Sequence, residues 1–167
     1  KGQGSYTPGD NAVHVNPLQM TSPKLLLATI LHEKIHPVLE PIIRDYLDNG
    51  GARLTEKQRA LMDEINRLHL IAKERAAEIL AENERRMASG QISRLEYEQT
   101  IRDLKPGTEN LSEFFTEAVN QPGFQNFLAD IRDSEGPTQK GGFLRRVLNR
   151  ILRLITGRDT IAEDSIL

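Results

Sequence analysis

The chain has 167 residues, of which 38% are hydrophobic and 28% are charged, which is typical of a folded domain with a real core. The net charge of −2 argues against a general nucleic-acid binder, and the absence of cysteine excludes disulfides and thiolate metal ligands. No signal peptide is visible and no apolar run is long enough to span a bilayer. Because the chain begins with Lys1, we expect a domain or processed piece of a longer protein.

The N-terminal segment favours a small β element followed by a buried helix. In "NAVHVNP", Asn11 to Pro17, valines alternate with smaller or polar residues, which predicts one short strand. Ser22 and Pro23 suit the N-cap and first position of a helix rich in leucine and isoleucine. The aliphatic, Trp-free composition and the helical spacings further along predict a mainly α fold with a small N-terminal β element, an α+β class.

Helices are expected through the rest of the chain. Thr55 and Gln58 form a capping box for a long helix that ends near Ala88, and Ser93 with Glu96 caps the next one. We expect the two to form a helical hairpin over 55–104. A loop over 105–110, helices over 111–120 and 124–131, a linker over 133–142 and a last helix over 143–155 follow. The predicted organisation is a domain over 1–132, the linker, and a helix with a polar tail over 143–167.

The sequence His32-Glu33-Lys34-Ile35-His36 is an HExxH pattern. Histidines four apart share one face of a helix, where both imidazoles can bind one Zn²⁺. The intervening Glu33 lies beside the metal and can act as a general base toward metal-bound water. Chance occurrence and a neutral pair of core histidines are the alternatives.

A catalytic zinc site usually has a third protein ligand. The candidates are Glu40, Glu56, Glu113 and Glu117. We favour Glu113, with Glu117 one turn later orienting a ligating imidazole. The alternatives are that Glu113 is a capping residue three after Asn110, and that Glu117 lies on a solvated face.

Two segments together resemble a known family. "LHEKIH" followed far downstream by "NLSEFFTEAVNQPGFQNFL" resembles the gluzincin-type metallopeptidase domains of phage and plasmid polyvalent proteins, which are similar to the anthrax lethal factor peptidase domain. The resemblance covers roughly residues 6–130. It implies a zincin-like fold with zinc bound by His32, His36 and Glu113, and with Glu117 in support.

The resemblance also implies partners and a location. A strand of the "NAVHVNP" kind, here with Val13, His14 and Val15, pairs with an extended peptide substrate in that family. His14 also fits an exposed strand histidine. The partners would be a peptide or protein substrate and neighbouring parts of a larger phage or mobile-element protein. The location would be the host cytoplasm or a virion.

The chain departs from the family pattern at two prolines. Pro106 stands where the family has a tyrosine seven residues before the ligand glutamate, and Tyr6 or Tyr97 is the candidate substitute. Pro37 removes the N–H that would bond the Glu33 carbonyl, although both histidines precede it. We therefore expect a zinc-dependent endopeptidase, with a catalytically weak or inactive zincin-fold interaction module as the alternative.

The last helix, residues 143–155, combines a broad apolar stripe with arginines on its other side. We expect the stripe to dock on this domain or on a neighbouring part of the parent protein. A helix lying on an anionic membrane, or part of a virion structural domain, is the alternative. His69, beside the stripe of the long helix, is expected to be a packing or surface residue.

Overall fold

The computed structural model describes residues 4–7, 12–15, 38–132 and 142–157. These residues are mostly helical, which confirms the mainly α class. The helices are residues 38–49, α2 (Glu56–Ala88), α3 (Arg94–Glu109), α4 (Leu111–Asn120), α5 (Pro122–Asp130) and α6 (Gly142–Thr156). Two strands, β1 (Gly4–Thr7) and β2 (Ala12–Val15), pair antiparallel with Tyr6 opposite Val13. The sequence pattern predicted a strand only at the second of these positions.

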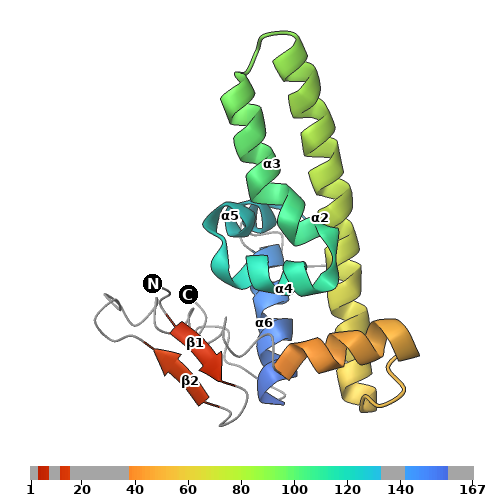
Figure 1. The fold of residues 1–167 in the computed structure, drawn as a ribbon. Helices are drawn as coiled ribbons and strands as arrows, with labels where there is room; N and C mark the ends of the chain where they lie inside the picture. Colours follow the sequence, from red (N-terminus) through yellow and green to blue (C-terminus); the bar gives the residue numbers. More distant parts are fainter. Residues whose placement is uncertain (1–3, 8–11, 16–37, 133–141, 158–167) are drawn as a thin grey trace.

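The helices α2 and α3 form an antiparallel hairpin whose distal part extends as an arm away from the other helices (Figure 1). Both predicted capping boxes are present. The Thr55 hydroxyl accepts from the Gln58 N–H at 3.2 Å, and the Ser93 hydroxyl accepts from the Glu96 N–H at the same distance. The predicted end of the long helix at Ala88 is confirmed, and Gly90 with a φ of 75° follows in the turn.

The predicted loop at 105–110 is wrong, because α3 continues to Glu109 and contains Pro106. The hairpin therefore extends beyond residue 104. Proline lacks the N–H that would bond the carbonyl one turn earlier, which normally ends a helix. Here the following Gly107 and Thr108 are buried, and the Thr108 hydroxyl donates to the carbonyls of Leu104 and Lys105 at 3.0 and 3.1 Å. Tertiary packing thus overrides the local signal.

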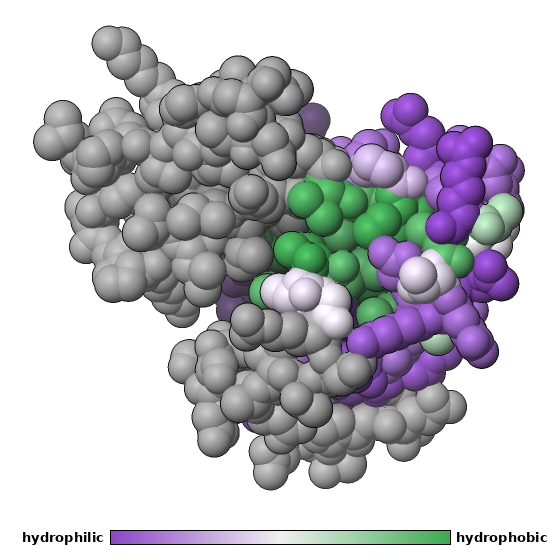
Figure 2. Space-filling view, turned by 90° about the horizontal axis from the view of Figure 1, so that it is seen from below, coloured by the Kyte–Doolittle hydropathy of each residue, from purple (hydrophilic) through white to green (hydrophobic). Residues whose placement is uncertain are grey.

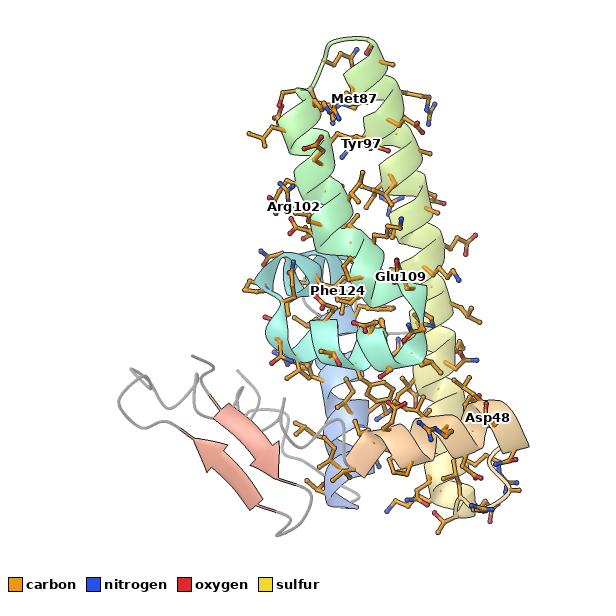
Figure 3. All side chains as sticks on the ribbon, viewed as in Figure 1. Asp48, Met87, Tyr97, Arg102, Glu109 and Phe124 are labelled. Atoms are coloured by element: carbon orange, nitrogen blue, oxygen red, sulfur yellow. The ribbon has the colours of Figure 1, made fainter. Side chains whose placement is uncertain are left out.

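The core lies where α4, α5 and α6 meet the base of the hairpin. Phe114 of α4 and Phe124 of α5 are fully buried, and their rings meet edge to face with centroids 6.0 Å apart. Phe124 fills the centre of this junction in Figure 3. Gly107 lets α3 approach it, because an added Cβ there would lie 2.5 Å from the Phe124 Cζ. The contact between α3 and α5 depends on a residue without a side chain.

A tight turn joins the helix at residues 38–49 to α2. Gly50 and Gly51 adopt φ values of 61° and 74°, which favour glycine. The buried Asp45 carboxylate accepts from the Arg53 N–H at 2.9 Å and from the Asn49 side chain at 3.1 Å. These bonds fix the direction in which the chain leaves the helix at 38–49.

The apolar stripe of α6 packs on α2, α4 and α5, so docking on the chain's own helices is confirmed. Phe143, Val147 and Ile151 are buried. On the polar side, the Arg150 Nε lies 2.6 Å from the Glu64 carboxylate of α2. Figure 2 shows apolar side chains gathered on the lower face of the molecule, bordered by polar helical surface. Among the described residues, no helix is long and apolar enough to cross a membrane.

Replacing Gly107 with alanine tests the contact between α3 and α5. In an open helix this change would stabilise the fold by about 1 kcal/mol. Here the Cβ meets the Phe124 ring, so we expect a loss of about 1–3 kcal/mol in the free energy of unfolding. Denaturant titration measures it. The loss should shrink in a Phe124→Leu background, and equal losses in both backgrounds would contradict the contact.

Replacing Ile151 with alanine tests the docking of α6. Ile151 is 1% exposed, so the truncation should lower the free energy of unfolding by about 2–5 kcal/mol. Arg145→Ala, outside the buried stripe, is the control, and thermal melting reports both. Because the stripe is covered, the intact chain should not co-sediment with anionic vesicles. Salt-sensitive co-sedimentation with an unchanged melting temperature in Ile151→Ala would instead favour a membrane helix.

Candidate metal centre

The structure describes one half of the predicted zinc site. His32, Glu33 and His36 lie outside the described residues. Glu113 and Glu117 lie on α4, and Glu40 lies on the helix at 38–49. Val13, His14 and Val15 form part of β2, of which the backbone pairing is described.

Helix α4 holds its two glutamates by burying its opposite face. Phe114, Phe115 and Ala118 are fully buried in the core, while Glu113 and Glu117 are half-buried. Residues four apart lie one above the other on a helix, so the two carboxylates share one face. The partial burial of this face means that it is not a freely solvated surface.

The cap of α4 leaves the Glu113 side chain available. The Asn110 side-chain oxygen accepts from the Glu113 N–H at 2.9 Å, which is the predicted capping interaction. The reciprocal bond of a capping box, from the Asn110 N–H to the Glu113 carboxylate, is not formed. No described residue donates a hydrogen bond or forms an ion pair to this carboxylate. Capping and metal binding are thus compatible, because they use different atoms of Glu113.

The two carboxylates on α4 influence each other. Burial raises the pKa of Glu117, and the nearby negative charge of Glu113 raises that pKa further. Both causes disfavour the charged form of Glu117. The two carboxylates therefore lie close enough on α4 for the charge of one to affect the other.

A long-range contact brings the segment after HExxH against the start of α4. The Ser112 hydroxyl donates to the Glu40 carboxylate at 3.1 Å, across 72 residues of sequence. Ser112 directly precedes Glu113, and Glu40 follows His36 by four residues. Arg44 lies 3.8 Å from the other Glu40 oxygen on an exposed surface. Sequence reasoning missed Ser112, because a pairing over this separation leaves no local pattern.

Two other candidates are placed elsewhere. Glu56 is exposed in the first turn of α2, where a negative charge interacts favourably with the helix dipole. Tyr97, considered as a substitute for the family tyrosine, lies on the arm near Met87, away from α4 (Figure 3). Tyr97 is therefore wrong as a substitute at this site. Pro106, at the family's tyrosine position, lies in the last turns of α3.

His69 is a packing histidine, as one of the two predicted interpretations had it. It is 6% exposed, its ring centroid lies 5.1 Å from that of Phe114, and its Nε2 lies 3.3 Å from the Thr108 carbonyl. Because a carbonyl only accepts, the neutral ring carries its proton on Nε2. Burial lowers the pKa of His69 and the charge of Lys73 lowers it further, while the Thr108 bond opposes both.

The described residues contain no complete metal site of three or more His, Asp or Glu side chains. A cavity of about 430 Å³ lies between α2 and the end of α5, lined by Ile71, Glu74, Arg75, Glu78 and residues 130–132. None of the predicted site residues lines it. This cavity is consequently not the glutamate side of the predicted centre.

Comparison with family models, curated proteins and solved structures finds no match to this chain. The resemblance to gluzincin-type peptidases therefore depends on the motifs at residues 31–36 and 110–128 and on the strand before them. The described ligand candidate fits zinc in its chemistry, because Glu113 offers a half-buried carboxylate without a partner among the described residues. Carboxylate and imidazole together are a common catalytic zinc ligand set.

Acid should destabilise the protein in part through His69. Its folded pKa lies below the unfolded value of about 6.5, so the unfolded chain binds more protons in the interval between them. Stability is therefore fully present above about pH 6.5 and is lost as the pH falls toward the lower folded pKa. His69→Gln keeps a donor for Thr108 but cannot titrate. Its free energy of unfolding, measured by denaturant titration from pH 7.5 to 5, should fall less steeply, whereas parallel curves would contradict this role.

Proposed function

We propose that this chain is a zinc-dependent endopeptidase domain of a zincin-like fold, within a larger phage or mobile-element protein. His32, His36 and Glu113 hold the metal, Glu117 supports them, and Glu33 is the general base. The strand with Val13, His14 and Val15 holds an extended peptide. The host cytoplasm or a virion is the proposed location.

The chemistry divides among few residues. Bound zinc supplies a Lewis acid that polarises the peptide carbonyl and acidifies a water molecule. Glu33 accepts the proton of the attacking water and delivers it to the leaving amine, so that the peptide bond breaks as the new C–O bond forms. Glu113 contributes a negative charge that favours a bound cation. Helix α4 is capped and its other face is buried, so its backbone would not need to rearrange for Glu113 to bind a metal.

One observation supports this proposal above the others. The bond between Ser112 and Glu40 places the chain four residues after His36 against the residue before Glu113. Four residues span at most about 14 Å when fully extended. This short separation along the chain is compatible with a metal shared between His36 and Glu113.

The metal prediction is one Zn²⁺ per chain in protein purified without chelator. His32→Ala and Glu113→Ala should each remove most of it, because each deletes a proposed ligand. Mass spectrometry of the metal content measures this, and Glu56→Ala is the matched control that leaves zinc in place. Sub-stoichiometric zinc that His32→Ala does not change would refute the site. Zinc retained in Glu113→Ala but lost in Glu117→Ala would move the ligand to Glu117.

Glu33→Gln separates the peptidase from an inactive interaction module. Glutamine keeps the shape and the hydrogen bonding but cannot accept the proton, so zinc should stay bound while peptide hydrolysis falls about 10²–10⁴-fold. A broad peptide library provides the substrates. Zinc binding without hydrolysis in either protein would favour the interaction module. The position of Tyr97 on the arm is the observation that supports that alternative, because it leaves Tyr6 alone as a candidate replacement for the family tyrosine.

A further inference from the structure

We infer that the distal arm of the helical hairpin, residues 81–102, is a conformational device that opens and closes by itself. In the open state the first turns of α3 separate from the end of α2, while the base of the hairpin and α4, α5 and α6 stay folded. The hydrogen bond between Asn83 and Thr100 is the clasp that holds the arm closed. This inference does not depend on the proposed zinc site, because none of the proposed ligands lies within the arm.

Burial stops at the point where the arm leaves the other helices (Figure 1). At the base of the hairpin, where α4, α5 and α6 pack against it, the buried residues include Leu68, Ala72, Ala76 and Leu104. From residue 77 to residue 103 no residue is buried, although both helices continue through this range. Because hydrophobic stabilisation scales with the apolar area removed from water, the arm is held together less tightly than the base.

The two helices of the arm meet along a seam that is only half covered. Met87 of α2 and Tyr97 and Ile101 of α3 are half-buried. Tyr97 and Ile101 share one face of α3 with the buried Leu104, and Met87 lies one turn after Asn83 on α2. Figure 3 shows Met87 and Tyr97 at the distal end of the arm, beyond the other helices. A pair of helices leaves both flanks of its seam open to water, so each seam residue buries only part of its apolar surface.

One side-chain hydrogen bond crosses the arm. The Asn83 amide donates to the Thr100 hydroxyl at 3.1 Å, and this hydroxyl donates in turn to the Glu96 carbonyl at 3.0 Å. The Thr100 hydroxyl is therefore satisfied both as an acceptor and as a donor. Among the described residues, no other side-chain hydrogen bond and no ion pair joins the two helices within the arm. A polar pair within an apolar seam also fixes the register of the two helices.

The ion pairs of the arm stabilise each helix separately. Arg85 pairs with Glu82 at 2.8 Å and Arg94 pairs with Glu98 at 2.8 Å, each within one helix. Because neither pair spans the two helices, neither opposes their separation. The part of α3 within the arm, residues 94–102, is shorter than the roughly 12–15 residues that an isolated helix needs in water. Once it is released from α2 it loses its helical hydrogen bonds, and its amides exchange with solvent.

Hydrogen exchange of the full chain, followed by mass spectrometry at neutral pH, tests this inference. Relative to their intrinsic rates, amides of residues 81–102 should exchange about tenfold or more faster than those of α4 and α5, and should respond little to low denaturant, because local opening exposes little surface. Asn83→Ala should speed the exchange of the arm about two- to tenfold, as the loss of one hydrogen bond predicts, and leave α4 and α5 unchanged. Thr100→Val should do the same, and the double variant should add little because both changes remove one interaction.

Two variants on the arm are matched controls. Glu82→Ala removes the ion pair with Arg85, one residue before Asn83. Leu95→Ala removes an apolar side chain that is 69% exposed. Neither change touches the bond between the two helices, so the exchange of the arm should match the wild type in both.

Three results would overturn the inference. Equal rates and an equal dependence on denaturant in the arm and in α4 would mean that the two unfold together. Faster exchange of α4 in Asn83→Ala, or an equal effect of Glu82→Ala on the arm, would show that the bond is not a clasp. Protection of the arm that rises with protein concentration would mean that a second copy covers the seam, so that the arm does not open by itself.

Discussion

The edge-to-face contact between Phe114 and Phe124 holds the described helices in one arrangement. Phe114 lies on α4 and Phe124 on α5, and the buried His69 ring of α2 packs against Phe114. Gly107 admits α3 to within contact of the Phe124 ring. Helix α4 has 10 residues, too few for an isolated helix to be stable in water, so its orientation follows from this packing. The packing of the aromatic core, and not any contact of Glu113, therefore sets the orientation of the helix that carries Glu113.

Local sequence signals predicted the starts of the capped helices correctly. The prediction failed where contacts between residues far apart in the sequence decide the structure. The capping boxes at Thr55 and Ser93 and the end of α2 at Ala88 are encoded within a few residues, so the sequence alone revealed them. Pro106 and Gly107 carried an equally clear signal for a loop, and it was misleading. Burial of Gly107 against Phe124 stabilises a helix that local propensity disfavours. Propensity is informative only where tertiary packing does not decide.

The contrast between local signals and long-range contacts also explains how much of the candidate site could be predicted. The spacing of Glu113 and Glu117 places both on one face of α4, and Asn110 three residues earlier predicts the cap. The structure adds that the cap uses the backbone N–H of Glu113 and leaves its carboxylate unused, so the cap does not exclude the proposed metal binding. The contact of Ser112 with Glu40 could not be predicted, because 72 residues separate the two and a single serine leaves no recognisable pattern in the sequence.

The distribution of burial along α2 separates the arm from the site. Its buried residues begin at Leu61 and end at Ala76, although the helix continues to Ala88. In α3 the buried residues are confined to Leu104, Gly107 and Thr108. The distal arm therefore adds little to the packing around Phe114. The buried residues of α2 and α3 lie at the base of the hairpin, where they complete the core on which α4 packs.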